Sequence, residues 1–208
     1  MYRSNDNRIF PMILIAVVVI ALVAGLVTVG RYLFSGTGNS EEVQSRQEVA
    51  REQLTTANTD SSVRMTIRGP LVADENFRSY RISISPDSRN YAEYSGYLDE
   101  ELDTKSYPNN RQAYVQFVHA LDKAAFTKEG KYSEEEAGDL RGICATGLVY
   151  EFEIMNGDDA TQSYWTSTCK GSQGTFGASV DQVKSLFRSQ IPAQQLNLGD
   201  AGRQPFRL

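Results

Sequence analysis

Two cysteines, Cys144 and Cys169, are the first residues whose type and spacing could carry chemistry. Redox-active pairs usually occupy a C-x-x-C motif, and zinc sites need further cysteine or histidine ligands. The sequence offers neither pattern. The interpretation that fits is a structural disulfide, which forms and persists in oxidising compartments.

The segment between the cysteines has the pattern of a β-hairpin. The run "LVYEFEIM" alternates between two faces, "SYWTST" is rich in β-prone residues, and Asn156-Gly157 between them is a strong hairpin-turn signal. With Asn156 and Gly157 as turn residues, Cys144 lies directly opposite Cys169. A longer loop through the two following aspartates would shift this register. The sequence therefore predicts a hairpin closed by a disulfide.

Other nucleophiles and bases give weak patterns. His119 is the single histidine and lies off the apolar stripe of its predicted helix, as surface histidines do. Ser167 and Lys170 have S-x-x-K spacing, but in a predicted strand residues three apart point to opposite faces. A G-x-S-x-G elbow and a phosphate-binding glycine loop are absent from the sequence. We therefore expect no catalytic residue, no metal site and no cofactor.

Carboxylates are abundant and form three clusters. These are Asp99, Glu100, Glu101 and Asp103; Glu134 to Glu136; and Asp158 with Asp159. Paired carboxylates could hydrolyse glycosidic bonds or hold calcium, although the calcium-loop spacing is missing. Solvated acidic loops are the commoner interpretation. A cell-envelope hydrolase therefore remains an alternative, and whether the protein is an enzyme stays open with a preference against it.

Aromatic residues form the remaining candidate site. Tyr91, Tyr94 and Tyr97 recur every three residues, a spacing that fits neither an ideal strand nor a long helix, and Gly96 could mark a bulge. Together with Trp165 they could form a ligand surface, which leaves carbohydrate binding open. Ordinary amphipathic packing with solvated hydroxyl groups is the alternative.

Residues 9–29 contain no charged residue and are long enough, at about 1.5 Å per residue, to span a bilayer. We expect a retained transmembrane helix, with cleavage as a signal peptide as the alternative. Arg3 and Arg8 precede this segment and Arg31 alone follows it before an acidic stretch. This bias predicts a plasma-membrane protein with a cytoplasmic N-terminus, residues 1–8, and an extracytoplasmic C-terminal domain.

The chain beyond this segment is acidic. From residue 35 onward it carries 18 lysines and arginines against 25 aspartates and glutamates, a net charge of −7, because three arginines and Asp6 precede residue 35. A nucleic-acid-binding protein would show the opposite sign and basic clusters. Nucleic acid is therefore not expected as a partner, and an anionic membrane surface would repel this domain.

The hydrophobic periodicity predicts one α+β domain at residues 62–192. Residues 63–67 and 80–84 alternate as half-buried strands, whereas residues 109–125 and 179–191 have the spacing of amphipathic helices with N-cap residues. We expect a mostly antiparallel sheet with two main helices on one face.

The segments on either side of this domain are polar. Residues 30–61 have a thin apolar stripe that includes Val49, Ala50 and Leu54, and we expect a juxtamembrane linker or a stalk helix. A short coiled coil is the alternative to a solvated spacer. Residues 193–208 lack periodicity and are expected to form a flexible tail.

The stretches "CATGLVYEFEI", "SYWTSTC", "GTF" and "LFRSQIP" resemble the extracytoplasmic part of small, uncharacterised single-pass proteins of candidate-phylum bacteria. The resemblance covers residues 62–192 and implies a bacterial, anchored, surface-facing protein without transferring any active site. We therefore expect a membrane-anchored binding or interaction module for an envelope protein or glycan. The alternatives are the envelope hydrolase and a structural subunit that associates weakly through Ala21 and Gly25.

Overall fold

The computed structural model describes Ile20 and residues 37–132, 136, 138, 142–171 and 174–192. It divides the chain into two units, Met1–Ser45 and Arg46–Leu208. The expected membrane span at residues 9–29 lies outside the described residues except for Ile20. Within the described part of the chain, no helix has the length and apolar character needed to cross a membrane.

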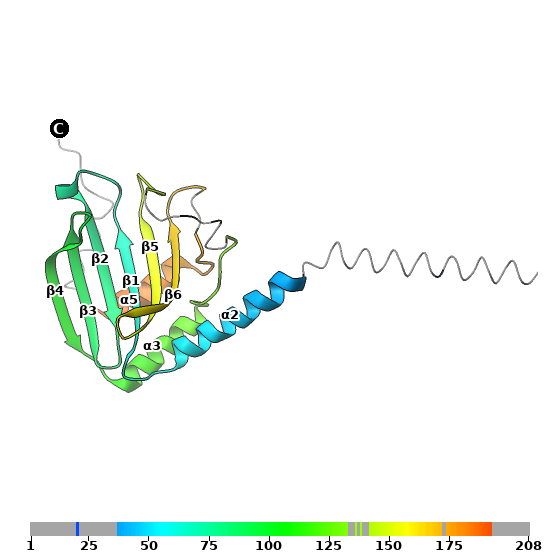
Figure 1. Ribbon diagram of the computed structural model, residues 1–208. Coiled ribbons are helices and arrows are strands. Elements are labelled where there is room, and N and C mark those ends of the chain that lie inside the picture. The colour runs from blue at the N-terminus through cyan, green and yellow to red at the C-terminus, as the bar shows by residue number, and fades with distance from the viewer. Residues whose placement is uncertain are drawn as a thin grey trace, which may run out of the picture. The chain divides into compact units, whose positions relative to one another are not determined.

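The second unit is built on one antiparallel sheet of six strands in the order β4-β3-β2-β1-β5-β6 (Figure 1). The strands are β1 (Ser61–Arg68), β2 (Arg78–Ile84), β3 (Ser88–Ser95), β4 (Glu100–Pro108), β5 (Val149–Asn156) and β6 (Asp159–Ser167). The helices of the described residues are α2 (Thr37–Thr55), α3 (Arg111–Lys123), α5 (Val180–Ser189) and the short 3-10 helix η2 (Asp74–Asn76). The predicted α+β class is confirmed, with three α-helices among the described residues of the chain where two main ones were expected.

The central strand β1 shows how the sequence makes a two-sided sheet. Val63, Met65 and Ile67 point to one face and are at most 5% exposed, whereas Arg64 and Arg68 alternate with them on the other. Residues of α3 and α5 pack on the apolar face, and Figure 1 shows α5 behind the strands. We call the opposite face, which these helices leave uncovered, the open face.

Both main helices begin where the sequence predicts. The Asn110 side chain accepts a hydrogen bond from the Ala113 N–H (2.9 Å) at the start of α3. Ser179 caps α5 in the same way by accepting from the Gln182 N–H (3.4 Å). Each cap satisfies a backbone donor that the first helical turn leaves unpaired.

The helix α2 belongs partly to the packed unit. Ala50 and Leu54 are each 1% exposed, and Leu54 joins the main core. The guanidinium of Arg51 donates two hydrogen bonds to the carboxylate of Asp122 on α3, at 2.6 and 2.7 Å. The folded core therefore includes residues from the segment that the sequence analysis assigned to a linker or stalk.

The β5–β6 hairpin is present, but its turn lies one residue later than predicted. Asn156 pairs with Asp159, so Gly157 and Asp158 are the two loop residues. Gly157 has a positive φ of 61°, a conformation that glycine adopts without steric conflict. The register predicted from a turn at Asn156-Gly157 is therefore wrong, and a β-bulge near the tip shifts it further.

The predicted disulfide is confirmed although the register is not. Cys144 and Cys169 are bonded with their Cα atoms 5.5 Å apart, just outside the paired strands. With Val149 and Trp165, Cys144 forms a small second apolar cluster in which these three residues are at most 7% exposed. A disulfide of this kind is typical of a domain that folds in an oxidising compartment.

Candidate functional site

The four aromatic residues proposed as a ligand surface do not come together. Tyr91 is 1% exposed on the helix-covered face, and its hydroxyl has no hydrogen-bond partner among the described residues; burial raises the pKa of this hydroxyl. Tyr94 lies half-buried on the open face, where the guanidinium of Arg81 is 5.0 Å from its ring centroid. Trp165 is buried beside the disulfide. Tyr97 alone is exposed, at 46%.

The charged residues of the open face neutralise one another. Arg64 donates to Glu153 (2.6 Å), and this hydrogen bond raises the pKa of its guanidinium. Arg68 donates to Glu151 (3.0 Å); burial acts to lower the pKa of its guanidinium, but the hydrogen bond and the charges of Glu151 and Asp99 together raise it. These pairs link β1 to β5 across the middle of the sheet. Because the cations and carboxylates are paired with each other, this face offers little unpaired charge for a substrate.

The structure does not place His119, or Ser167 and Lys170, in a catalytic arrangement. His119 is exposed on α3, and the Ser167 hydroxyl oxygen accepts a hydrogen bond from the Cys169 N–H (3.2 Å). Among the described residues, no three metal-ligating side chains form a group that could hold an ion. Of the carboxylate clusters, the one that begins at Asp99 extends from the β3–β4 turn into the first residues of β4 (Glu100–Pro108).

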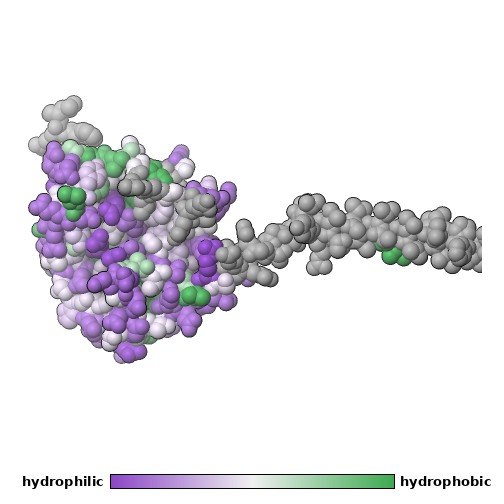
Figure 2. Space-filling view, in the orientation of Figure 1, coloured by the Kyte–Doolittle hydropathy of each residue, from purple (hydrophilic) through white to green (hydrophobic). Residues whose placement is uncertain are grey.

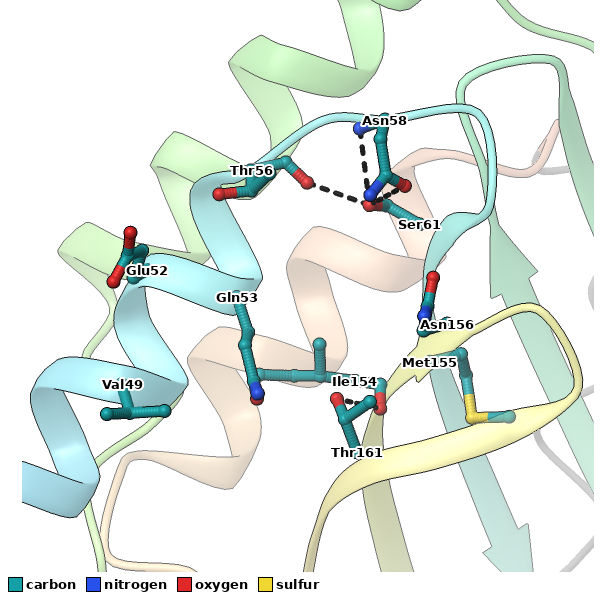
Figure 3. Close-up of a pocket in the computed structure, with 10 residues that line it drawn as sticks. All are labelled: Val49, Glu52, Gln53, Thr56, Asn58, Ser61, Ile154, Met155, Asn156 and Thr161. Atoms are coloured by element: carbon teal, nitrogen blue, oxygen red, sulfur yellow. Dashed lines mark hydrogen bonds between the residues drawn. The ribbon is translucent and has the colours of Figure 1, made fainter.

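One groove lies between α2 and the β5–β6 hairpin (Figure 3). Its volume is about 360 Å³, and it is lined by Val49, Glu52, Gln53, Thr56, Asn58, Ser61, Ile154, Met155, Asn156 and Thr161. Two of its hydroxyls are already used: Ser61 donates to the Thr56 carbonyl (2.8 Å) and Thr161 to the Ile154 carbonyl (3.1 Å). Glu52 is the single ionisable residue of this lining, so the groove presents one charged group and no pair of titratable groups that could act together on a substrate.

A different surface combines exposure with a fixed conformation. Leu71, Val72, Tyr97 and Leu98 are 45%, 37%, 46% and 95% exposed, and we call them the end patch. They lie on the β1–β2 loop and the β3–β4 turn, at the same end of the sheet. Figure 2 shows apolar surface gathered over that end.

The side chain of Tyr97 ties the two parts of the end patch together. Its hydroxyl accepts a hydrogen bond from the Val72 N–H (3.1 Å) and donates one to the Val72 carbonyl (2.7 Å). Its ring stacks on the buried Phe77 with the centroids 4.2 Å apart. The backbone N–H of Tyr97 donates to the carboxylate of Asp74 at 2.8 Å. The β3–β4 turn is therefore fixed to the β1–β2 loop immediately before Leu98.

The residue after Leu98 is fixed as well. Asp99 adopts a positive φ of 55°, which costs a non-glycine residue on the order of 1 kcal/mol. Its carboxylate accepts hydrogen bonds from Arg68 and from the Ser79 hydroxyl, both at 3.5 Å, and lies 4.0 Å from the guanidinium of Arg81. These contacts hold the strained backbone in place. Leu98 thus projects into solvent between two anchored neighbours.

The disulfide segment supports the end patch from the other side. The N–H of Leu71 donates to the Ala145 carbonyl at 2.9 Å, and Ala145 follows the bonded Cys144. The carbonyl therefore sits on a segment that a covalent bond holds in place. The disulfide, which the sequence indicates only as a structural bond of an oxidising compartment, also helps to position the end patch.

Replacing Tyr97 with phenylalanine should loosen the end patch without unfolding the domain. The Tyr97→Phe variant removes both hydrogen bonds to Val72 but keeps the ring on Phe77. We expect a loss of about 0.5–1.5 kcal/mol in the free energy of unfolding. The amide of Val72 should exchange faster with deuterium, while core amides change little. The same exchange rate at Val72 in both proteins would contradict the clamp.

Comparison with protein-family models finds no match for this chain, and comparison with curated proteins finds none either.

Sequence reasoning missed three of the four residues of the end patch. Leu71 and Val72 follow Gly69-Pro70, and Leu98 lies in "GYLD", so both apolar groups occur in turn-like segments. Apolar residues in such segments are a signal that could have indicated an exposed contact surface. Hydrophobic periodicity does not indicate these residues, because turns have no regular spacing of apolar side chains.

Proposed function

We propose that this protein is a membrane-anchored, extracytoplasmic docking module that binds another envelope protein through the end patch. The observation that carries this proposal is the side chain of Leu98, which is 95% exposed and lies between two anchored residues. A single exposed leucine is ordinary, but a group of four exposed apolar residues on a fixed backbone is typical of a contact surface.

The fixed conformation of the end patch favours binding. A surface loop that must become ordered on association loses conformational entropy, and that loss weakens the complex. Here Tyr97 and Asp99 already hold the backbone on both sides of Leu98. A partner pocket that receives Leu98 would therefore gain most of the burial free energy of a leucine side chain, about 1.5–3 kcal/mol.

The chemistry of the site favours a protein over a glycan. Sugar-binding sites commonly present an exposed aromatic ring, whereas Trp165 and Tyr91 are buried and the ring of Tyr97 is stacked on Phe77. The apolar run at residues 9–29 supports membrane anchoring. The disulfide supports an extracytoplasmic position for the domain.

Site-specific photo-crosslinking in intact cells tests the proposal. We would replace Leu98 with a photoreactive amino acid in the full-length chain, and Lys123 on α3 as a control at another exposed position. We expect one discrete adduct from position 98, none from position 123, and loss of the adduct when Leu71→Asp is added. Adducts of equal yield from both positions, or an adduct unaffected by Leu71→Asp, would contradict the proposal.

A further inference from the structure

We infer that the partner of the end patch contributes an extended, basic segment that adds to the outer edge of β4. This inference rests on the proposed docking function and specifies the chemistry and the binding mode of the partner. It is carried by three observations on β4: an outer edge to which no described strand pairs, carboxylates without an ion-pair partner among the described residues, and a second exposed leucine.

The outer edge of β4 is unpaired in the part of the chain that the structure describes. β4 is the first strand of the sheet and pairs with β3 alone. Every one of its nine residues is exposed or half-buried. Along such an edge alternate backbone N–H and carbonyl groups point outward and can pair with another extended chain.

The charges near the end patch select a basic partner. Glu100 and Glu101 are exposed and form no ion pair with another described residue, and Glu75 on η2 likewise has no cationic partner. Lys105 is the single cation of β4, and Asp103 of the same strand neutralises it. Lysine or arginine on an added strand would meet the exposed carboxylates of Glu100 and Glu101 at the rim of the contact.

Exposed apolar side chains continue from the end patch onto β4. Leu102 is 51% exposed and lies at the β-bulge where the pairing of β3 and β4 shifts, between Glu101 and Asp103. Leu98 lies in the turn that leads directly into β4. An added segment with apolar residues among its basic ones could therefore contact Leu98 and Leu102 while its backbone pairs with β4.

A synthetic peptide tests this inference on the full-length chain in detergent. The probe is a fluorescein-labelled peptide of alternating lysine and valine, about ten residues long, which matches the reach of an ordinary strand. Binding is measured by fluorescence anisotropy, and the site by hydrogen–deuterium exchange of residues 100–108. We expect saturable binding that weakens as salt is added and slows exchange in β4.

Two protein variants with the same change in charge locate the contact. Glu100→Lys/Glu101→Lys reverses the carboxylates of β4, whereas Asp158→Lys/Asp159→Lys reverses an adjacent exposed pair at the opposite end of the sheet. We expect the first variant to weaken binding about tenfold and the second less than twofold, since two rim ion pairs together account for about one order of magnitude. Equal weakening by both variants would overturn the inference.

Two further peptides separate strand addition from simple charge attraction. A peptide N-methylated at every backbone nitrogen keeps the lysines but offers no backbone hydrogen-bond donor to β4, and a peptide with glutamate in place of lysine reverses the charge. Neither should bind. Equal binding of the N-methylated peptide, or concentration-dependent protection of β4 by a second copy of the chain alone, would overturn the inference. If the Leu98 adduct persists while the peptide does not bind, the docking function stands and only this inference fails.

Discussion

Phe126→Ala is expected to destabilise the domain by about 3–5 kcal/mol, the range for removing a fully buried phenylalanine ring. Phe126 is 0% exposed and follows α3, where it packs against four aromatic rings from the sheet, α5 and the loop before α5. Its ring centroid lies 5.9 Å from Phe152 and 6.2 Å from both Phe176 and Phe187. Truncation removes these contacts together, and a domain stable by about 5–15 kcal/mol loses a large part of its stability.

Chemical denaturation of the full-length chain measures this effect. Trp165 is the single tryptophan and is buried, so its fluorescence reports unfolding. The conservative control Phe126→Leu should lose less than about 1.5 kcal/mol, and Tyr132→Ala, at a 37% exposed position, less than about 0.5 kcal/mol. A loss below about 1 kcal/mol in Phe126→Ala would show that the ring is not at the centre of the core.

Removing the disulfide has the second large expected effect. The Cys144→Ser/Cys169→Ser variant should lose on the order of 3 kcal/mol, because the bond closes a loop with a sequence separation of 25 and restricts the unfolded chain. The small cluster of Val149 and Trp165 also loses part of its cover. The amide of Leu71, which donates to Ala145, should then exchange faster than the change in global stability alone requires.

Reduction of the wild-type protein provides the matching control. A reducing agent should lower the unfolding midpoint of the wild-type chain towards that of the double variant and leave the variant unchanged. If the reduced protein and the double variant keep the wild-type midpoint, the bond does not stabilise the fold. If the exchange of Leu71 follows global stability alone, the disulfide does not support the end patch.

The sequence predicted those strands and helices whose apolar residues recur at a regular spacing. The alternation at Val63, Met65 and Ile67 predicted β1, and the helical spacing with caps at Asn110 and Ser179 predicted α3 and α5. These elements each bury one face, so burial leaves a regular trace in the sequence. The two cysteines also indicated their disulfide, because no competing partner for either of them exists in the chain.

Elements whose apolar residues have no regular spacing could not be predicted from the sequence. β4 has no buried residue, so "EELDTKSYP" shows no apolar alternation, and its first residues have the composition of an acidic cluster. The tyrosines at 91 and 94 lie on opposite faces of β3, and Gly96 lies in the turn with a φ of 70°, not at the bulge. The end of α2 is buried by tertiary contacts of Leu54, which a thin apolar stripe does not predict.

The hairpin tip shows a limit of a different kind. Asn156-Gly157 correctly indicated a turn, but the loop residues are Gly157 and Asp158. A shift of one residue at the tip changes every pair along both strands. The two cysteines still meet despite the shifted register, because both lie outside the paired residues of β5 and β6.

The central claim is that Leu98 binds a partner, and a crosslink from a neighbouring position tests it most directly. A photoreactive amino acid in place of Val72 crosslinks to a partner bound at the end patch, while residue 98 is free to be substituted. The account predicts that Leu98→Asp abolishes the adduct from position 72 and leaves the unfolding midpoint unchanged, because Leu98 is 95% exposed. An adduct of undiminished yield in Leu98→Asp would contradict the account.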